Sequence, residues 1–551
     1  MNKNILWGNQ PINQIEKCVK EEFVTIENDL FYKIENYTEI EPFFMTLTSN
    51  TNHWMFLSST GGVTTGRVNS ESSLFPYYTD DRITENITNT GPKTIILVTK
   101  DNNTYIWEPF TQFSNEIYNT SNNLYKNTLG NRVIFEEINN TLGVKFSYSW
   151  MNSRKFGIVR ESVLTNLSDT KIEISLVDGV QNVLPAGVDS QIQNEFSCLL
   201  NGYKRTELDP TGVGLFTLSA TLTDLAEPSE SLKTNTIWQT GLEVKSYLLE
   251  SSQLNKFRKG EELSSQTDVK GDRGAYFVES QFILNSKESK NWLIVLDVEK
   301  DLTELEKLKN IINYNDNILN SVKEDVALGS KELTSILNQN DGLQVSNKSM
   351  NSVHHQANIL FNIMRGGYFS DSYNIDINDF ADFIKITNIN VYKSTESELL
   401  KLDHKLDYNQ VKVFVDKMKD SDLQRIWVDY LPLTFSRRHG DPSRPWNKFS
   451  IETEKEDGSA KLDYQGNWRD IFQNWEALCY SYPKYLKHVI GKFFNASTMD
   501  GYNPYRVSRN GIDWECPEPG NPWANIGYWS DHQIIYLLKL LELYKSHKPK
   551  D

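Results

Sequence analysis

The chain has few cysteines and no long apolar run. Its four cysteines are far apart in the sequence, so none can form the closely spaced pair of a zinc or redox motif. We expect free thiols in a reducing compartment. No apolar run approaches the roughly 20 residues that cross a bilayer, and the first residues lack the apolar core of a signal peptide. These absences predict a cytoplasmic protein.

An excess of basic residues is also missing. The net charge of −16 argues against nucleic acid and anionic membranes as partners, because both attract basic surfaces. The eight histidines show no metal-ligand spacing, so we expect no metal and no bound cofactor. The Gly-, Ser- and Thr-rich segment 58–66 lacks the Gly-Lys pair of a phosphate-binding loop, and neither a dinucleotide fingerprint nor a Gly-x-Ser-x-Gly elbow occurs.

The chain is nevertheless a folded, multidomain protein by its composition. Hydrophobic residues make up 38% and charged residues 24% of the sequence, which is typical of globular proteins. A length of 551 residues suggests about two to four domains.

The first part, residues 1–298, is rich in β-structure signals. Short β-branched or alternating runs are separated by Gly, Asn and Asp turns, at 94–98, 132–135, 171–177, 215–220, 275–284 and 292–296. Many strands and few helices predict a large antiparallel β-sandwich. A weak helical pattern at 209–227 is the one interruption that we expect.

The remainder has helical periodicity. Residues 299–345 predict a helical linker, because Leu302, Leu305 and Leu308 recur on one face. Residues 346–551 predict an α-helical domain, with helices expected at 352–366, 377–386, 395–402, 408–418, 468–479, 483–494 and 531–547.

Tryptophan is concentrated in this helical part. Seven of the thirteen tryptophans lie between Trp427 and Trp529, next to charged residues. Indole faces beside a guanidinium, an amide and a carboxylate suit a sugar ring, whose apolar face stacks while its hydroxyls form hydrogen bonds. The alternative is a Trp-rich core. The candidate substrate-binding residues of this segment are Trp468, Arg469, Asp470, Gln473, Trp475 and Glu476.

A second polar segment lies at 437–447, which its Gly and Pro residues predict to be a loop. A loop with three arginines, a histidine and a carboxylate is typical of a binding site on a rigid scaffold, and the alternative is a surface ion-pair cluster. Its candidate substrate-binding residues are Arg437, Arg438, His439, Asp441, Arg444 and Trp446.

Asp513, Glu515 and Asp531 are the candidate catalytic carboxylates. Cleavage of a glycosidic bond needs a carboxylic acid to protonate the leaving oxygen, and hydrolysis with inversion also needs a base. Asp513 and Glu515 could instead order a loop. Asp531 could instead cap the last helix, where an acid complements the helix dipole.

These features together resemble the cellobiose/cellodextrin phosphorylase family of inverting phosphorylases and hydrolases. The resemblance lies in the sandwich–linker–helix order and in the segment Trp468–Asn474, which is similar to an aromatic-Arg-Asp-x-x-Gln-Asp motif of that family. It implies that Arg469 and Asp470 hold the non-reducing-end sugar. Two weaker likenesses are 502–513 with Ser530–Asp531, and the loops 59–62 and 75–78, which in the family reach toward the active site.

Departures from the family indicate a divergent member. Asn474 and Trp475 replace the expected residues, and the loop 437–447 has no counterpart that we can place. The (α/α)6 barrel of the family needs twelve helices, over about 300 residues, whereas only about two hundred follow residue 345. We therefore expect a partial barrel. The family's general acid would then lie beyond Asp551.

The sequence thus predicts a multidomain β plus α protein with a partial (α/α)6 barrel. The expected function is inverting phosphorolysis or hydrolysis of β-linked gluco-oligosaccharides, with inorganic phosphate as co-substrate in the first case. The alternative is a non-catalytic carbohydrate-binding protein, and the sequence does not decide whether the chain is an enzyme. A homodimer or a complementing C-terminal polypeptide are the protein partners left open.

Overall fold

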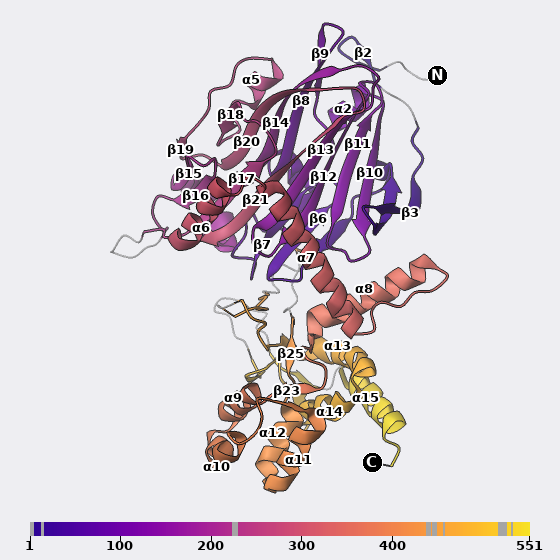
Figure 1. Ribbon diagram of the computed structural model, residues 1–551, viewed down its shortest axis with the longest axis vertical. Helices are drawn as coiled ribbons and strands as arrows, with labels where there is room; N and C mark the ends of the chain where they lie inside the picture. The colour runs from indigo at the N-terminus through magenta and orange to yellow at the C-terminus, as the bar shows by residue number, and fades with distance from the viewer. Residues whose placement is uncertain are drawn as a thin grey trace. The chain divides into compact units, whose positions relative to one another are not determined.

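The computed structural model describes residues 5–12, 16–222, 230–436, 442–443, 449–455, 458–515, 526–529 and 533–550. Two compact units divide the chain at Leu333 and Thr334. We call residues 5–333 the β unit, and residues 334–436 together with 449–550 the helical unit. Figure 1 shows the large sheets of the β unit and the helices of the helical unit.

The main sheet of the β unit has eleven antiparallel strands. In spatial order they are β19 (Asp268–Lys270), β15 (Lys204–Leu208), β16 (Gly214–Leu218), β17 (Thr234–Thr240), β21 (Ser289–Lys300), β13 (Gly157–Asn166), β12 (Val144–Ser153), β11 (Val133–Asn139), β10 (Thr120–Asn127), β4 (Asp29–Glu35) and β3 (Lys20–Ile26).

Smaller sheets complete the β unit. A five-stranded antiparallel sheet has the order β18 (Ser246–Leu248), β20 (Gly274–Leu284), β14 (Ile172–Val183), β8 (Gly91–Lys100) and β9 (Asn103–Trp107). A three-stranded sheet contains β5 (Phe44–Leu47), β6 (His53–Ser58) and β7 (Val63–Arg67), and β1 (Leu6–Trp7) pairs with β2 (Gln10–Pro11).

The core of the β unit lies between the eleven-stranded and five-stranded sheets. Phe146 on β12 and Trp292 on β21 form one hydrophobic cluster with Leu176 on β14 and Val278 on β20. Side chains of alternate residues on a strand point to the same face, so each sheet contributes one apolar face. This arrangement confirms the predicted antiparallel β-sandwich.

Several short helices, the helix α6 and the first part of α7 belong to the same unit. The short ones are η1 (Tyr37–Glu39), α1 (Asp80–Glu85), η2 (Asn86–Thr88), α2 (Gln112–Ile117), α3 (Ser190–Glu195), α4 (Ser197–Asn201) and α5 (Leu254–Arg258). The helix predicted at 209–227 is wrong for the described part of that range, because 214–218 forms strand β16. After β21, α6 (Leu302–Tyr314) and α7 (Ile318–Gln339) follow, and the unit boundary falls inside α7.

The helical unit contains α8 (Ser349–Gly366), α9 (Ile377–Thr387), α10 (Ile389–Leu399), α11 (Tyr408–Met418), α12 (Ser421–Asp429), α13 (Trp468–Ser481), η3 (Pro483–Tyr485), α14 (Leu486–Asn495) and α15 (Gln533–His547). Its strands are the pairs β22 (Tyr368–Phe369) with β25 (Leu433–Thr434), β23 (Asn374–Asp376) with β24 (Lys405–Asp407), and β27 (Tyr502–Asn503) with β30 (Tyr528–Trp529). A three-stranded sheet joins β26 (Gln465–Asn467), β28 (Arg506–Ser508) and β29 (Gly511–Asp513).

The order of a β region followed by a helical region is therefore confirmed. Helix α12 and the small sheets were not predicted from the sequence. Whether the helices form part of an (α/α)6 barrel stays a prediction, as do the domain boundaries at 298 and 345. No helix in the described ranges is both long and apolar enough to cross a membrane.

Candidate functional site

Helix α13 carries most of the predicted binding residues, and its sequence explains its two faces. Apolar residues recur three and four positions apart and are buried: Trp468, Ile471, Phe472, Trp475, Leu478 and Cys479. This spacing places them on one side of a helix. Arg469, Asp470 and Gln473 lie on the other side and are exposed, and Glu476 is half-buried.

Trp468 and Trp475 belong to the buried side, and their predicted role as sugar platforms is wrong. Both side chains have an exposed fraction of 0%. Trp468 packs against Phe472 and Phe493, with ring centroids 4.6 and 4.8 Å apart. The Trp475 indole N–H donates to the Gly366 carbonyl at 2.9 Å. The alternative prediction, a Trp-rich core, is correct for these two residues. Both indoles point toward the core of the helical unit because of their spacing along the helix.

The three-stranded sheet brings the start of α13 to the second predicted segment. Asn467, the last residue of β26, pairs with Arg506 on β28, which pairs with Asp513 on β29. The Trp468 backbone N–H donates to the Tyr505 carbonyl at 2.8 Å. The first turn of α13, with Asp470, therefore begins beside the strand pair that carries Asp513.

Asp513 takes part in an ion pair at this sheet. The Arg506 Nε donates to the Asp513 Oδ2 at 2.6 Å, and both side chains are partly exposed. Charge-assisted hydrogen bonds of this length orient both groups. Glu515 is exposed, and Asp531 lies outside the described residues.

An aromatic cluster that the sequence reasoning missed lies beside Asp513. The rings of Tyr502 and Trp514 are stacked, with centroids 5.8 Å apart and planes 10° apart. Tyr502 also contacts Trp529, at 4.9 Å between centroids, and Trp529 is 63% exposed. The sequence feature that could have predicted this exposed cluster is the position of its residues in short strands and loops. An aromatic side chain there is less often enclosed than one in the core-facing side of a helix.

Other predicted residues are only partly described. Arg437, Arg438, His439, Asp441, Arg444 and Trp446 lie outside the described residues. In the β unit, the turn 59–62 joins β6 to β7, and Phe75 and Tyr77 are buried. Their predicted reach toward the sugar site stays a prediction. In the described part of the chain, no group of three or more His, Cys, Asp or Glu residues could hold a metal ion.

A polar network ties the segment 369–432 to helix α14 and to the turn between β28 and β29. Arg509 donates to Asp379 on α9 at 2.7 Å, and the Tyr430 hydroxyl donates to the same carboxylate at 2.7 Å. Lys492 on α14 pairs with Asp429 at the end of α12 at 2.9 Å. Burial, reinforced by Asp379, raises the pKa of Tyr430 well above its usual value. The network fixes this segment against the core that supports α13.

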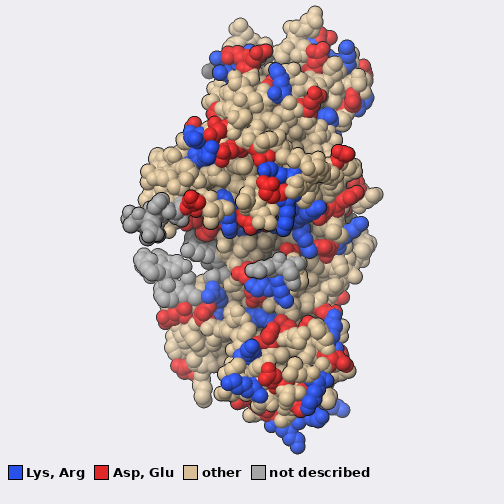
Figure 2. All heavy atoms as spheres, turned by 60° about the vertical axis from the view of Figure 1, so that its left-hand side comes forward, with Lys and Arg blue, Asp and Glu red and all other residues tan. Residues whose placement is uncertain are grey.

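Charged side chains form no single-sign surface on the face that Figure 2 shows. Lys and Arg are interspersed with Asp and Glu over both units.

Comparison with known proteins links this segment to carbohydrate chemistry. Residues 369–432 match glycoside hydrolase family 149 insertion domain 1, a range that begins in β22 and ends three residues after α12. No protein of curated function matches the sequence.

Several solved structures are similar at low identity. A bacterial glucoamylase in complex with acarbose is 9% identical with a TM-score of 0.35, over 98% of this chain and 69% of that one. A candidate kojibiose phosphorylase from the human microbiome is 11% identical with a TM-score of 0.28, over 90% of this chain and 54% of that one. A candidate aldose 1-epimerase of Escherichia coli K12 is 9% identical with a TM-score of 0.28, over 47% of this chain and 99% of that one.

The similarity to these solved structures is too low to indicate an activity. The match to the insertion domain is therefore the informative comparison. It makes residues 369–432 similar to an insertion domain of a glycoside hydrolase family. It leaves the substrate open, and it does not single out the cellobiose phosphorylases.

Proposed function

We propose that this chain is a divergent inverting glycoside phosphorylase or hydrolase, or the N-terminal part of one, that acts on β-linked gluco-oligosaccharides. The observation that carries the proposal is the meeting of two segments at one small sheet. There the exposed side of α13 begins beside the Arg506–Asp513 ion pair, in a chain that contains an insertion domain of a glycoside hydrolase family.

The proposed division of roles follows the chemistry of the side chains. Arg469 and Asp470 would hold the hydroxyls of a sugar, because a guanidinium donates and a carboxylate accepts hydrogen bonds. The stacked rings of Tyr502 and Trp514, with Trp529 nearby, replace Trp468 and Trp475 as the surface on which a sugar ring would stack.

The proton donor is proposed among Asp513 and Glu515, or in a complementing polypeptide. An inverting hydrolase needs two carboxyl groups about 6.5–9.5 Å apart, with a water molecule between them. A phosphorylase needs only one, because inorganic phosphate is the nucleophile. Phosphate dependence therefore separates the two reactions.

The first experiment incubates the chain with cello- and laminari-oligosaccharides, with and without inorganic phosphate. Sugar 1-phosphate formed only with phosphate supports phosphorolysis, and free sugar formed without it supports hydrolysis. Arg469→Ala and Asp470→Ala are expected to lower kcat/KM by about tenfold or more, since each removes a charge-assisted hydrogen bond.

The matched controls lie on another helix of the same unit. Asp422 occupies the first turn of α12, as Asp470 does in α13, and Arg425 is exposed three residues later. Asp422→Ala and Arg425→Ala should leave kcat/KM unchanged. If kcat/KM is the same in the α13 variants as in these controls, Arg469 and Asp470 do not belong to the site.

Non-catalytic binding is the second candidate, and one contact favours it. Asp513 is the one candidate acid with a described side-chain partner, since it forms an ion pair with Arg506. A carboxylate held in this way is suited to binding a sugar as well as to catalysis. Calorimetry with the same oligosaccharides tests this candidate. Saturable binding that Arg469→Ala weakens, with no product under either condition, would establish it.

A further inference from the structure

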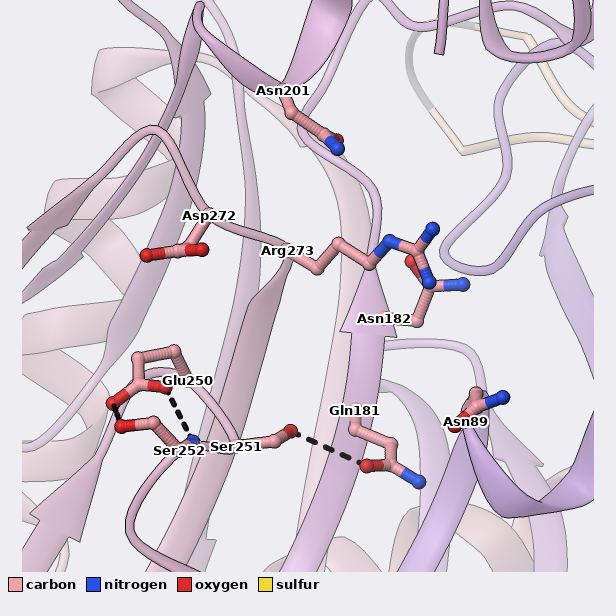
Figure 3. A pocket seen from close by; sticks show the side chains of 9 residues that line it. All are labelled: Asn89, Gln181, Asn182, Asn201, Glu250, Ser251, Ser252, Asp272 and Arg273. Atoms are coloured by element: carbon pink, nitrogen blue, oxygen red, sulfur yellow. Dashed lines mark hydrogen bonds between the residues drawn. The ribbon is translucent and has the colours of Figure 1, made fainter. Parts of the chain in front are cut away.

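A polar pocket of about 310 Å³ lies in the β unit, and none of the candidate site residues named above lines it. It opens at one end of the five-stranded sheet, where β14 ends and where β8 and β20 begin. Figure 3 shows its lining side chains: Asn89, Gln181, Asn182, Asn201, Glu250, Ser251, Ser252, Asp272 and Arg273. Five separate segments of the chain contribute them.

The composition of this lining is unusual. Ligand pockets are lined mostly by hydrophobic and aromatic side chains, with a few polar groups. Here every lining residue is polar: four amides, two hydroxyls, two carboxylates and one guanidinium. Such a surface offers mainly hydrogen-bond donors and acceptors, with less apolar than polar area. Its ligand would therefore be recognised mainly through hydrogen bonds.

Two buried amides on β14 are held in place by the protein. Gln181 is 5% exposed, and its amide nitrogen donates to the Thr88 carbonyl at 2.8 Å. Asn182 is 8% exposed, and its amide nitrogen donates to the Thr90 hydroxyl at 2.8 Å. The Ser251 hydroxyl donates to the Gln181 carbonyl oxygen, as drawn in Figure 3. These bonds fix the orientation of both amides before any ligand arrives.

The backbone is distorted at the same place. The register between β14 and β20 shifts between Gln181 and Val183, so Asn182 is the extra residue of a β-bulge. Its φ of 55° is left-handed, a conformation that costs energy for residues other than glycine. Bulges redirect a side chain and are frequent beside binding sites. Here the bulge places the Asn182 side chain in the pocket lining.

The charged groups of the lining are more exposed than the two amides on β14. Glu250 is fixed by the backbone N–H and hydroxyl of Ser252 and by the Gln266 amide at 2.7 Å. Arg273 is exposed and makes no ion pair with a residue in the described ranges, and Figure 3 shows its side chain extending over the pocket. One cation with the carboxylates of Glu250 and Asp272 leaves the lining with a net negative charge, which does not favour an anion.

We propose that this pocket is a second carbohydrate site, which binds one neutral sugar unit mainly through hydrogen bonds. Adjacent hydroxyls of a sugar each donate and accept, and they match the mixture of amides, carboxylates and guanidinium in the lining. The volume is at the lower end of the range for ligand pockets, about 300–1,000 Å³, so it takes a small ligand such as a monosaccharide or the end of a longer chain. The site is independent of the one proposed on α13.

The test is saturation-transfer NMR on the full chain with a panel of neutral monosaccharides that includes glucose, galactose, mannose and xylose. At least one should bind saturably, and Arg273→Ala and Asn182→Gly should each weaken its binding by about tenfold. Glycine tolerates the left-handed backbone of residue 182, and Arg273 is exposed, so neither variant requires a change of backbone conformation; circular dichroism checks that both are folded.

A matched control exists in the same unit. Asn36 is 7% exposed, has a φ of 54°, and donates its amide to the Cys18 carbonyl at 3.0 Å, but it does not line the pocket. Asn36→Gly should leave monosaccharide binding unchanged. Arg469→Ala should also leave it unchanged, which separates this site from the one on α13.

Three results would overturn the proposal. The first is that no sugar of the panel binds. The second is that Asn182→Gly and Arg273→Ala bind as tightly as Asn36→Gly. The third is that inorganic phosphate binds and the sugars do not, which would make the pocket an anion site.

Discussion

His488 shows how burial sets the chemistry of one residue in the helical unit. Its Nδ1–H donates to the Tyr430 carbonyl at 3.0 Å, and its Nε2 accepts from the Tyr408 hydroxyl at 2.8 Å. The tautomer follows because a carbonyl can only accept. Burial lowers the pKa of His488 to about 4. The imidazole is therefore a neutral structural link between α14 and the segment 369–432.

The stability of the helical unit should depend on this histidine between pH 6.5 and 4. The unfolded chain, with a pKa of about 6.5, binds a proton in this range and the folded chain does not, so stability falls as the pH falls. The loss is about 3 kcal/mol when the pH reaches 4. His488→Asn keeps a donor for the Tyr430 carbonyl and removes the titration. Denaturant melts at several pH values should show a flatter profile for this variant, and an unchanged slope would contradict the pKa shift.

At the scale of a secondary-structure element, α13 is both a core helix and the candidate binding helix. Its buried residues follow helical spacing, so the sequence predicted the helix and its apolar stripe. The sequence also placed Trp468 next to Arg469 and Asp470, but successive side chains of a helix are about 100° apart. Arg469 and Asp470 therefore lie on the exposed side of α13, although their neighbour Trp468 is buried.

The two faces should respond differently to alanine. Trp475→Ala removes a fully buried indole and its hydrogen bond to Gly366, and should destabilise the helical unit by about 3–5 kcal/mol. Gln473→Ala on the exposed side should change stability by less than about 0.5 kcal/mol. Urea denaturation monitored by circular dichroism measures both. Comparable effects from the two substitutions would contradict the assigned faces.

At the scale of the whole molecule, the two units should have opposite pH dependence. In the β unit, Glu137 accepts hydrogen bonds from the Trp107 indole and the Phe110 backbone, and burial raises its pKa to about 7. The folded state then holds a proton that the unfolded state releases above about pH 4.5. The stability contribution of Glu137 is present below that pH and is lost as the pH rises through 7.

Calorimetry on the full chain should therefore resolve two transitions. Between pH 4.5 and 6.5 the β-unit transition should move down as the pH rises, and the helical-unit transition should move up. Glu137→Gln should flatten only the first and His488→Asn only the second. A single transition, or a variant that alters the slope of the other unit, would contradict the assignment of these residues to separately folding units.

Local sequence patterns determined much of the secondary structure of this protein. The β-rich part, the helices that follow it, the bounds of α11 and the first residue of α13 are encoded in short-range spacing, because side-chain period and turn residues act over a few positions. Tertiary structure alone decided which aromatic rings are enclosed, that Asp513 pairs with Arg506, and that segments from Asn89 to Arg273 enclose one polar pocket. These features depend on contacts between residues far apart in the chain. The spacing of residues along the sequence does not indicate which element packs against a given face of a helix or sheet.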